Sequence, residues 1–335
     1  MQAGEAIYEK EENQKNQVDH CGHQNFTIEQ KATIDRVQAC GGFEEVAKTI
    51  ERIKKLRILV IGEPILDIYR FVTPEGISSK SPSISARFQY EEKYHGGSLA
   101  IRNHLLSFSD HVNLQSPNQI VPKKIRYISG NQRIFEVTEI EEQSANDHFI
   151  DLIMGQIDKT DLIILADFGH GLFEGEMLNI CNDLKPFIAL NVQTNSSNFG
   201  FNPYHKHKRF NYLCLDTREA RIAEHDRYSH PLTVAHKVHE RIKTMMSMTA
   251  GPTGAYFFNG YNTHYSPSFV DNIVDATGAG DAYFAITACL IKAECHPDLV
   301  PFVGNIFAGL KTKILGNKTN VSKSSLLKAI KYILA

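Results

Sequence analysis

From residue 56 onward, short apolar runs alternate with segments in which apolar residues recur every three or four positions. The apolar runs cover residues 56–62, 161–167, 187–192 and 212–216, and each has the length of a buried strand. Strands that alternate with helices predict βαβ units, and hence a sheet covered by helices on both faces. We therefore predict an α/β fold with a doubly wound, mostly parallel sheet.

A second pattern, strict alternation of apolar and polar residues, marks strands with one exposed face. In residues 83–94, Ile84, Ala86, Phe88 and Tyr90 fall on one face and polar residues fall on the other. Residues 123–137 read as two further strands around a turn at 129–131. We predict a small exposed β-sheet lid, with strands around 72–95 and 123–138, inserted after the first strand of the main sheet.

The N-terminal part of the chain divides into two segments. Residues 1–32 are polar and predict a disordered tail, and residues 33–55 have helical periodicity interrupted at Gly41-Gly42 and predict a helical linker. Residues 56–335 would then form one domain. The tail contains HCGH, residues 20–23, which matches the HxGH pattern of nucleotidyltransferases. That motif needs a preceding strand and a full nucleotide-binding domain around it, and neither fits before Arg57, so we interpret this match as a coincidence.

Composition excludes several classes of protein. The formal net charge of the 335 residues is −2, which gives no basic field for a nucleic-acid partner. The six cysteines include no CxxC pair, so a metal-ligand spacing or a disulfide framework is not expected, and a reducing compartment is favoured. No apolar run is long enough to cross a bilayer, and the first residues lack the apolar core of a secretory signal. We expect a soluble cytoplasmic protein without a membrane partner.

The stretch VDATGAGDAYFA begins at Val274, after a strand-like run at 272–274, and leads into a long apolar helix. It is not a Walker A loop, because no Lys-Ser/Thr follows, and Tyr283 occupies the third glycine position of a dinucleotide fingerprint. Small residues at a helix N-terminus let backbone amides converge on an anion. Gly278, Ala279 and Gly280 therefore predict an anion hole for a phosphoryl group.

A carboxylate in such a turn has two interpretations. Asp281 would repel a bound phosphate, but it could take a proton from a hydroxyl that attacks a phosphoryl group held by the amides. It could also serve only as a favourable first-turn residue of the helix. The turn alone does not decide between them.

The surrounding motifs favour the first interpretation through a resemblance. VDATGAGDAYFA resembles the C-terminal signature of the ribokinase, or PfkB, family of carbohydrate kinases, YHGGSLAIRNHL resembles its N-terminal glycine-glycine motif, and RILVIGEPILDIY resembles its first strand. GGSLAIRNH, LNVQTNSSNFGFN and FVGNIFAGLKTKILGNK resemble heptose-7-phosphate kinases and, more closely, the PfkB domains fused to cytidylyltransferases. The likeness extends from Leu56 to the C-terminus, which would make 33–55 a linker from a larger architecture.

The resemblance implies a role for individual residues. Asp281 would be the catalytic base, with Gly278, Ala279 and Gly280 as the anion hole. Sugar or sugar-phosphate binding would fall to the following residues: Asp67, Gly96, Gly97, Asn103, Arg126 and Asn191. ATP would be bound by another set: Asp216, Glu219, Thr249, Gly251, Gly254 and Asn305. Glu219 would organise Mg²⁺ through water, and Asp275 and Thr277 lie near the position where many relatives bind a monovalent cation such as K⁺. In relatives such lids often pair two subunits, so a homodimer through the lid strands is a further option.

Several of these residues also have a purely structural interpretation. Asp67 could be a turn residue, Gly96-Gly97 a tight turn before a helix, and Glu219 a solvated first-turn residue. Lys124, Arg126 and Arg133 could form a cluster that binds a substrate phosphate, or could simply keep an exposed strand soluble. A last set could face the sugar or bond its own loop: Asn191, Gln193 and Asn195.

The sequence also departs from the family pattern. The Asn-x-x-Glu motif reads Asp216-Thr-Arg-Glu219, Ala100 occupies a position where heptose kinases usually have asparagine, and Glu63 replaces the aspartate of the first-strand motif. Residues 111–123 have room for one strand and a loop, where relatives fit a strand-helix-strand.

Two functions follow as hypotheses. The first is an ATP-dependent sugar or sugar-phosphate kinase with Asp281 as the base. The second is a catalytically weak PfkB-fold module that binds a nucleotide or sugar phosphate, which the Asp216 change and the short 111–123 segment favour. Nucleotidyl transfer through HCGH is a third, remote candidate.

Overall fold

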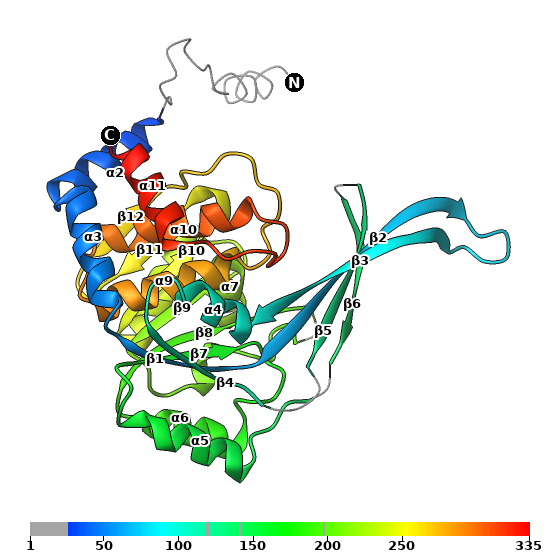
Figure 1. Ribbon diagram of the computed structural model, residues 1–335, viewed down its shortest axis with the longest axis horizontal. Helices are drawn as coiled ribbons and strands as arrows, with labels where there is room; N and C mark the ends of the chain where they lie inside the picture. The colour runs from blue at the N-terminus through cyan, green and yellow to red at the C-terminus, as the bar shows by residue number, and fades with distance from the viewer. Residues whose placement is uncertain (1–25, 118–120, 131, 141, 197) are drawn as a thin grey trace.

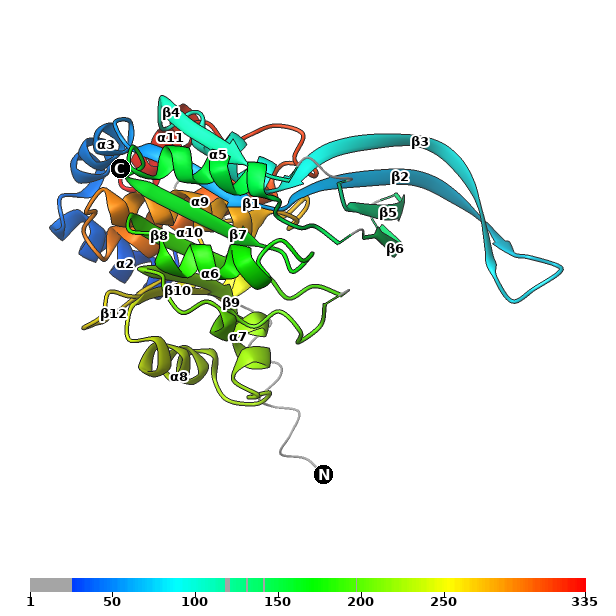
Figure 2. The ribbon, with the colours of Figure 1, turned by 90° about the horizontal axis from the view of Figure 1, so that it is seen from below.

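We describe a computed structural model of the chain, which defines residues 26–117, 121–130, 132–140, 142–196 and 198–335. Residues 1–25 of the predicted 1–32 tail, with the HCGH motif, lie outside the described residues. Two sheets make up the β-structure: a large sheet in the body, and a smaller one that projects from it (Figures 1 and 2).

The large sheet has the strand order β12-β11-β10-β9-β8-β7-β1-β4. The five pairs from β4 to β10 are parallel, and the last two pairs are antiparallel. The strands are β1 (Arg57–Gly62), β4 (His111–Gln115), β7 (Leu162–Asp167), β8 (Phe187–Val192), β9 (Tyr212–Asp216), β10 (Met245–Thr249), β11 (Ala255–Phe258) and β12 (Thr263–Ser266). The predicted fold class is confirmed, and residues 111–123 supply one edge strand, β4, as their length predicts.

Helices cover both faces of this sheet, and the alternation along β1 shows why. Ile58 and Val60 belong to the apolar core on one face, whereas Leu59 and Ile61 belong to the core on the other. The first core packs against α3 (Gly42–Ile53), α4 (Ser98–Leu105), α9 (Ala279–Lys292), α10 (Leu299–Thr312) and α11 (Lys323–Ile333). The second packs against α5 (Asp147–Ile157), α6 (Gly175–Asp183), α7 (Thr217–Ala223) and α8 (Pro231–Ile242). This is the layered arrangement expected of βαβ units.

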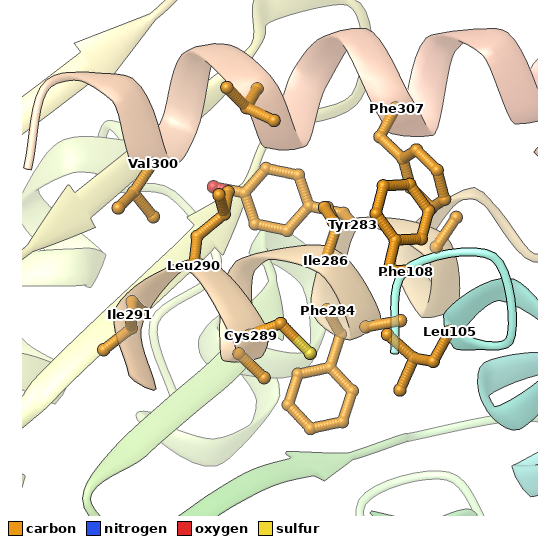
Figure 3. Close-up of a cluster of buried hydrophobic side chains, with 14 of the residues drawn as sticks. Leu105, Phe108, Tyr283, Phe284, Ile286, Cys289, Leu290, Ile291, Val300 and Phe307 are labelled. Carbon is orange, nitrogen blue, oxygen red and sulfur yellow. The ribbon is translucent and has the colours of Figure 1, made fainter. Parts of the chain in front are cut away.

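Helix α9 lies in the middle of the first core. Its residues from 281 to 291 are all buried, which is typical of a helix enclosed on every side. Figure 3 shows Tyr283, Ile286 and Leu290 between the α9 axis and α10, with Leu105 and Phe108 at the side. The packing fixes the orientation of α9, and hence the position of its N-terminal turn. The predicted strand at 272–274 is not formed, and instead the Val274 and Asp275 N–H groups donate to the Thr312 carbonyl.

The N-terminal helices are part of the core. Helix α2 (Ile28–Ala39) begins five residues before the predicted boundary at 32/33, with Thr27 and Gln30 forming a capping box. Gly41 breaks the helical segment as predicted, with φ of 94°. Val37, on α2, and Ile50, on α3, are at most 1% exposed and join the first core. The expected linker is therefore a layer of the domain, because its apolar faces are covered.

The smaller sheet has the order β3-β2-β5-β6, from β2 (Pro64–Ile77), β3 (Ile84–Gly97), β5 (Lys123–Ser129) and β6 (Gln132–Glu139). Strand β2 starts at Pro64, eight residues before the predicted lid boundary, because it follows β1 almost directly. The outer halves of β2 and β3 extend far from the body as a long hairpin (Figure 1). Residues 84–90 are exposed throughout, so the apolar face of β3 is not covered within one chain.

Candidate active site

A cavity of about 240 Å³ lies where the carboxyl ends of the parallel strands meet the base of the lid. This is the edge at which ligands bind in sheets of this kind. Its walls include the following predicted residues: Asp67, Gly97, Arg126, Asn191, Asp216, Glu219, Thr249, Thr277, Gly278, Gly280 and Asp281. Other predicted residues do not line it: Gly96, Asn103, Gly251, Gly254, Asp275, Ala279 and Asn305.

Asp281 is the acid at the centre of this cavity. It occupies the first turn of α9, is 7% exposed, and accepts a hydrogen bond of 2.7 Å from the Gln193 side-chain amide. Burial, reinforced by the negative charge of Asp67, raises its pKa to about 6, while Lys124 and Lys311 oppose the rise. A carboxyl group with a pKa near 6 can exchange a proton close to neutral pH.

The first turn of α9, which carries Asp281, also has backbone N–H groups that are available to bind an anion. Gly278 is the N-cap of α9 and has φ of 77°, a conformation that glycine adopts without strain. The Ala279 N–H donates to the Ala276 carbonyl at 3.2 Å. The N–H groups of Gly278, Gly280 and Asp281 make no hydrogen bond within the described part of the chain. An anion hole in this turn would thus use positions 278, 280 and 281, instead of the predicted 278–280.

Asp67 and Arg126 form a buried ion pair across the lid base. Asp67 is on β2, Arg126 is on β5, and both are about 5% exposed or less. The Arg126 guanidinium also pairs with Glu136 of β6 at 2.9 Å. Arg126 is therefore already neutralised, and its predicted role as a phosphate ligand is weakened. The Asp67 carboxylate remains at the cavity wall.

The glycine pair has a structural reason of its own. A Cβ on Gly96 would lie 2.3 Å from Asp67 Oδ2, and one on Gly97 would lie 2.4 Å from the Glu63 carbonyl oxygen. Gly97 also has φ of 62°. These glycines give space to the Asp67 carboxylate and to the chain leaving β1, so the interpretation as a tight turn before a helix is supported. Asn103, on α4, lies away from the cavity and contacts Arg102.

Lys124 is a cation without a partner in the cavity wall. It makes no hydrogen bond or ion pair with any described residue, although Asp67, Glu136 and Asp281 act on it through their charges. Burial lowers its pKa. Arg133, the third member of the predicted cluster, is 45% exposed in its side chain, pairs with Glu136 at 3.7 Å and donates to the Thr277 hydroxyl at 3.2 Å. Of the three basic residues in the predicted cluster, Lys124 alone has no partner among the described residues, so it is the one that can bind an anionic substrate group.

Asp216 and Glu219 begin α7 as a capping box. The Asp216 side chain accepts from the Glu219 N–H at 2.7 Å, and the Glu219 side chain accepts from the Asp216 N–H at 2.8 Å. Burial, with Asp216 nearby, raises the pKa of Glu219 well above its ordinary range. Its carboxylate faces the cavity at 8% exposure, so it is not the solvated residue of the structural interpretation.

Of the polar residues at the end of β8 and after it, some face the cavity and others stabilise their own loop, the two interpretations given for them above. The Asn191 amide donates to the Cys214 carbonyl at 2.9 Å, and its Oδ1 is buried in the cavity wall with no partner in the described chain. Gln193 orients Asp281, as given above. Asn195 bonds the Phe168 carbonyl and Asn198, which makes it a loop-stabilising residue. The sequence alone does not show which of these residues face the cavity and which stabilise their own loop.

On the predicted nucleotide side, Thr249 ends β10 in the cavity wall, and residues 250–254 connect β10 to the antiparallel strand β11. A Cβ on Gly254 would lie 2.1 Å from the Ser266 carbonyl oxygen, so this glycine is required by the packing of β12. The Asn305 amide donates to the Ser266 and Pro267 carbonyls at 2.7 and 3.3 Å, which joins α10 to the end of β12. The contacts of these two residues are structural.

The sequence of the chain is similar to those of known proteins. Residues 177–300 match the sequence profile of the pfkB family carbohydrate kinases. The bifunctional protein HldE of Trichlorobacter lovleyi is 21% identical, covering 85% of this chain and 65% of that protein, and HldE of Helicobacter hepaticus is 22% identical, covering 84% and 64%. The chain thus spans slightly less than two thirds of the length of these curated relatives.

Solved structures show the same fold. Ribokinase from Thermotoga maritima superposes with a TM-score of 0.66 at 14% identity, covering 82% of this chain and 99% of that one. Phosphofructokinase-2 from Escherichia coli, solved with substrates and products, gives 0.64 at 10% identity, covering 84% and 100%.

The fold is a ribokinase-like α/β fold. The resemblance to pfkB family carbohydrate kinases is confirmed, because residues 177–300 match that family and the HldE relatives are similar over most of the chain. No helix in the described residues is long and apolar enough to cross a membrane.

Proposed function

We propose that the chain is an ATP-dependent kinase that transfers the terminal phosphoryl group to a hydroxyl of a sugar or sugar phosphate. The supporting observation is one cavity in which a buried carboxyl group, Asp281, lies beside unpaired N–H groups of its own helix turn. The carboxylate can accept a proton, and the N–H groups can stabilise the negative charge of a phosphoryl group in transfer.

The reaction uses Asp281 as the base. Its carboxylate takes the proton of the sugar hydroxyl as that oxygen attacks the terminal phosphorus of ATP. A new P–O bond forms to the sugar while the bond to the bridging oxygen of ADP breaks, and ADP leaves with that electron pair. The Gln193 amide fixes the carboxylate through the 2.7 Å hydrogen bond. The amides of the α9 turn stabilise the charge on the transferred group.

The charge of the cavity fits the use of Mg²⁺ with ATP. The wall has four acidic residues, Asp67, Asp216, Glu219 and Asp281, and two basic ones, Lys124 and Arg126, which gives a formal charge of −2 when all are ionised; the raised pKa of Glu219 shows that this state is unfavourable without a further cation. A triphosphate would be repelled by this wall without a divalent cation, and carboxylate oxygens are the ligands that Mg²⁺ prefers. Glu219 and Asp216 would hold it, directly or through water, and it would neutralise phosphate charge.

The Lys124 side chain indicates that the acceptor substrate carries an anionic group. A partly buried ammonium without a partner is unfavourable unless a ligand completes its contacts. We infer that the acceptor is a sugar phosphate and that its phosphate contacts Lys124. A neutral sugar would leave the ammonium unpaired.

The experiment is transfer of phosphate from ATP to a panel of heptoses and hexoses, each offered with and without a phosphate, measured by ADP release and product mass. We expect turnover with one or more sugar phosphates and loss of turnover in Asp281→Asn, with ATP binding retained. Unchanged turnover in Asp281→Asn would exclude the base role.

The second candidate is a nucleotide- or sugar-phosphate-binding module with little catalysis. It is favoured by Asp216, whose carboxylate adds negative charge to the predicted ATP side of the cavity. Its signature would be saturable ATP binding with no transfer to any sugar in the panel. Asp216→Asn would then increase transfer if the added charge is the cause.

We also propose that the lid pairs two copies of the chain. Its outer strands expose large apolar side chains: Ile77, Ile84, Phe88, Tyr90, Phe135 and Val137, each at least 39% exposed. Large exposed apolar side chains gathered on projecting strands are typical of an interface. Light scattering should give twice the chain mass, and Phe88→Glu should give the monomer. A wild-type monomer at high protein concentration would contradict the proposal.

A further inference from the structure

A buried lysine lies directly behind the α9 turn. Lys311, near the C-terminal end of α10, is 0% exposed, and its ammonium donates to the backbone carbonyls of Thr277 at 2.9 Å and Gly316 at 2.6 Å. Thr277 immediately precedes Gly278, the N-cap of the helix that bears Asp281. The ammonium therefore joins the anion-hole turn to the loop that follows α10.

The Lys311 ammonium contacts two backbone carbonyls, and the Asp275 carboxylate acts on it through its charge without forming an ion pair; we call these three groups the oxygen cage. The Asp275 carboxylate accepts from the Thr277 N–H at 2.9 Å, from the Gly316 N–H at 2.9 Å and from the Tyr69 hydroxyl at 2.7 Å. Burial lowers the pKa of Lys311, and the negative charges of Asp275, Asp281 and Asp67 oppose that shift. Carbonyls and one carboxylate around a single positive charge are the donor set of a small cation site.

This cage leaves no place for a monovalent cation. The carbonyls of Thr277 and Gly316 already accept hydrogen bonds from the ammonium, and both Asp275 oxygens accept from N–H or O–H donors. A K⁺ ion at this position would meet the ammonium at contact distance, which strong charge repulsion prevents. The residues therefore do not fit K⁺, and the expectation of a monovalent cation at Asp275 and Thr277 is not supported.

We propose that the Lys311 ammonium is a covalently tethered substitute for an activating monovalent cation, and that phosphoryl transfer by this chain is independent of K⁺ and Na⁺. Lys311 acts as a positioning residue: it holds the Thr277–Gly278 turn, and its charge favours ionised Asp281. A Cβ on Gly278 would lie 3.0 Å from Asn317 Oδ1 and 3.4 Å from Lys311 Cε, so the glycine allows the lysine to pack beneath the turn.

The proposal rests on the proposed kinase function for its activity measurement. Initial rates are compared in buffers whose only monovalent cation is choline, Na⁺, K⁺ or NH₄⁺, for the wild type, Lys311→Ala, Lys311→Met and the control Lys313→Met. Lys313, two residues further along, is exposed and makes no contact with the turn. We expect equal wild-type rates in all four buffers and a wild-type rate for Lys313→Met.

The two Lys311 variants give the decisive contrast. Lys311→Ala removes the ammonium and leaves space, so its rate in choline should fall about 10²-fold, as for other lost electrostatic groups near a reacting phosphate, and K⁺ or NH₄⁺ should restore much of it. Lys311→Met fills the space without charge, so the added cations should not restore its rate. The acid limb of the Lys311→Met pH profile should move to higher pH, because Asp281 loses a nearby positive charge.

A wild-type rate that rises severalfold with K⁺ would overturn the proposal, as would a Lys311→Ala variant that is unaffected or is not restored by either cation. Thermal melting separates this outcome from failure of the kinase assignment. If no sugar accepts phosphate, K⁺ should still raise the Tm of Lys311→Ala more than that of the wild type or Lys311→Met. Equal shifts in all three proteins would refute the tethered-cation role by itself.

Discussion

Replacing Asp281 by asparagine should abolish transfer and at the same time stabilise the protein at neutral pH. The folded-state pKa of Asp281 is about 6, against an ordinary value of 3.8. A raised folded pKa means that the group stabilises the fold while protonated, below pH 3.8, and that this contribution is lost as the pH rises through about 6. The difference of about two units corresponds to a destabilisation of about 3 kcal/mol at pH 7.

Asparagine has the same shape, can still accept the Gln193 hydrogen bond, and cannot ionise. Asp281→Asn should therefore be more stable than the wild type by up to about 3 kcal/mol at pH 7, which corresponds to a Tm increase of several degrees. The gain should decrease steadily towards pH 4. Calorimetry or thermal fluorescence at pH 7, 6 and 5 measures the trend, with Asp147→Asn, an exposed first-turn residue of α5, as the matched control.

The activity of the wild type should follow the same ionisation. Below pH 6 the rate should fall about tenfold per pH unit, because the base must be ionised, and Asp281→Asn should lose about 10²–10⁴ of the wild-type rate. A variant that is less stable than the wild type at pH 7, or equally displaced in Tm at every pH, would refute the assigned burial and charge of Asp281.

Three further changes test other parts of the structure. Lys124→Met should raise the KM for a sugar phosphate about 10–100-fold, because one charged hydrogen bond is lost, with little change for ATP; an unchanged KM would remove Lys124 from the substrate site. Gly96→Ala should destabilise the protein by about 1–3 kcal/mol, because its Cβ would collide with Asp67. Gly130→Ala is the control for overpacking, because its Cβ would meet no atom within 4 Å; its φ of 57° adds backbone strain only. Ile50→Ala should reduce the free energy of unfolding by about 2–5 kcal/mol in denaturant titration, and a loss below about 0.5 kcal/mol would restore the linker interpretation of α3.

The parts of the fold that the sequence predicted are those in which local pattern and burial agree. Strands β1, β7, β8 and β9 have continuous apolar runs because both of their faces are covered, and the run and the strand coincide within a residue or two. The N-terminal helices were misassigned because the periodicity of a linker helix and of a core helix is similar. Helix α3 is buried by contacts with α9 and α11, and α2 contacts α10 and β12, all of which lie more than two hundred residues away along the chain.

The sequence predicts the site residues that lie together in one short motif, but it does not predict the residues that reach the site from distant parts of the chain. Asp281 and the glycine turn are adjacent in sequence, whereas Gln193 and Lys311 reach them from other elements with no local signal. Lys124 was one of three basic residues with equal claims, and only the ion pairs of Arg126 and Arg133 separate it from them. Asn305 and Asn103 have plausible positions along the chain, but their contacts lie elsewhere in the fold.

The enclosure of α9 links chemical rate to interior packing. Asp281 lies in the first turn of α9, a helix held in place by side chains of neighbouring elements, such as Phe307 of α10 and Leu105 of α4 (Figure 3). A large-to-small substitution in the core several turns away would let α9 shift by a fraction of an ångström. That shift is enough to misalign proton transfer, although the substituted residue does not contact a reactant. Selection for turnover in this protein would therefore act on its interior side chains as strongly as on those that meet the ligand.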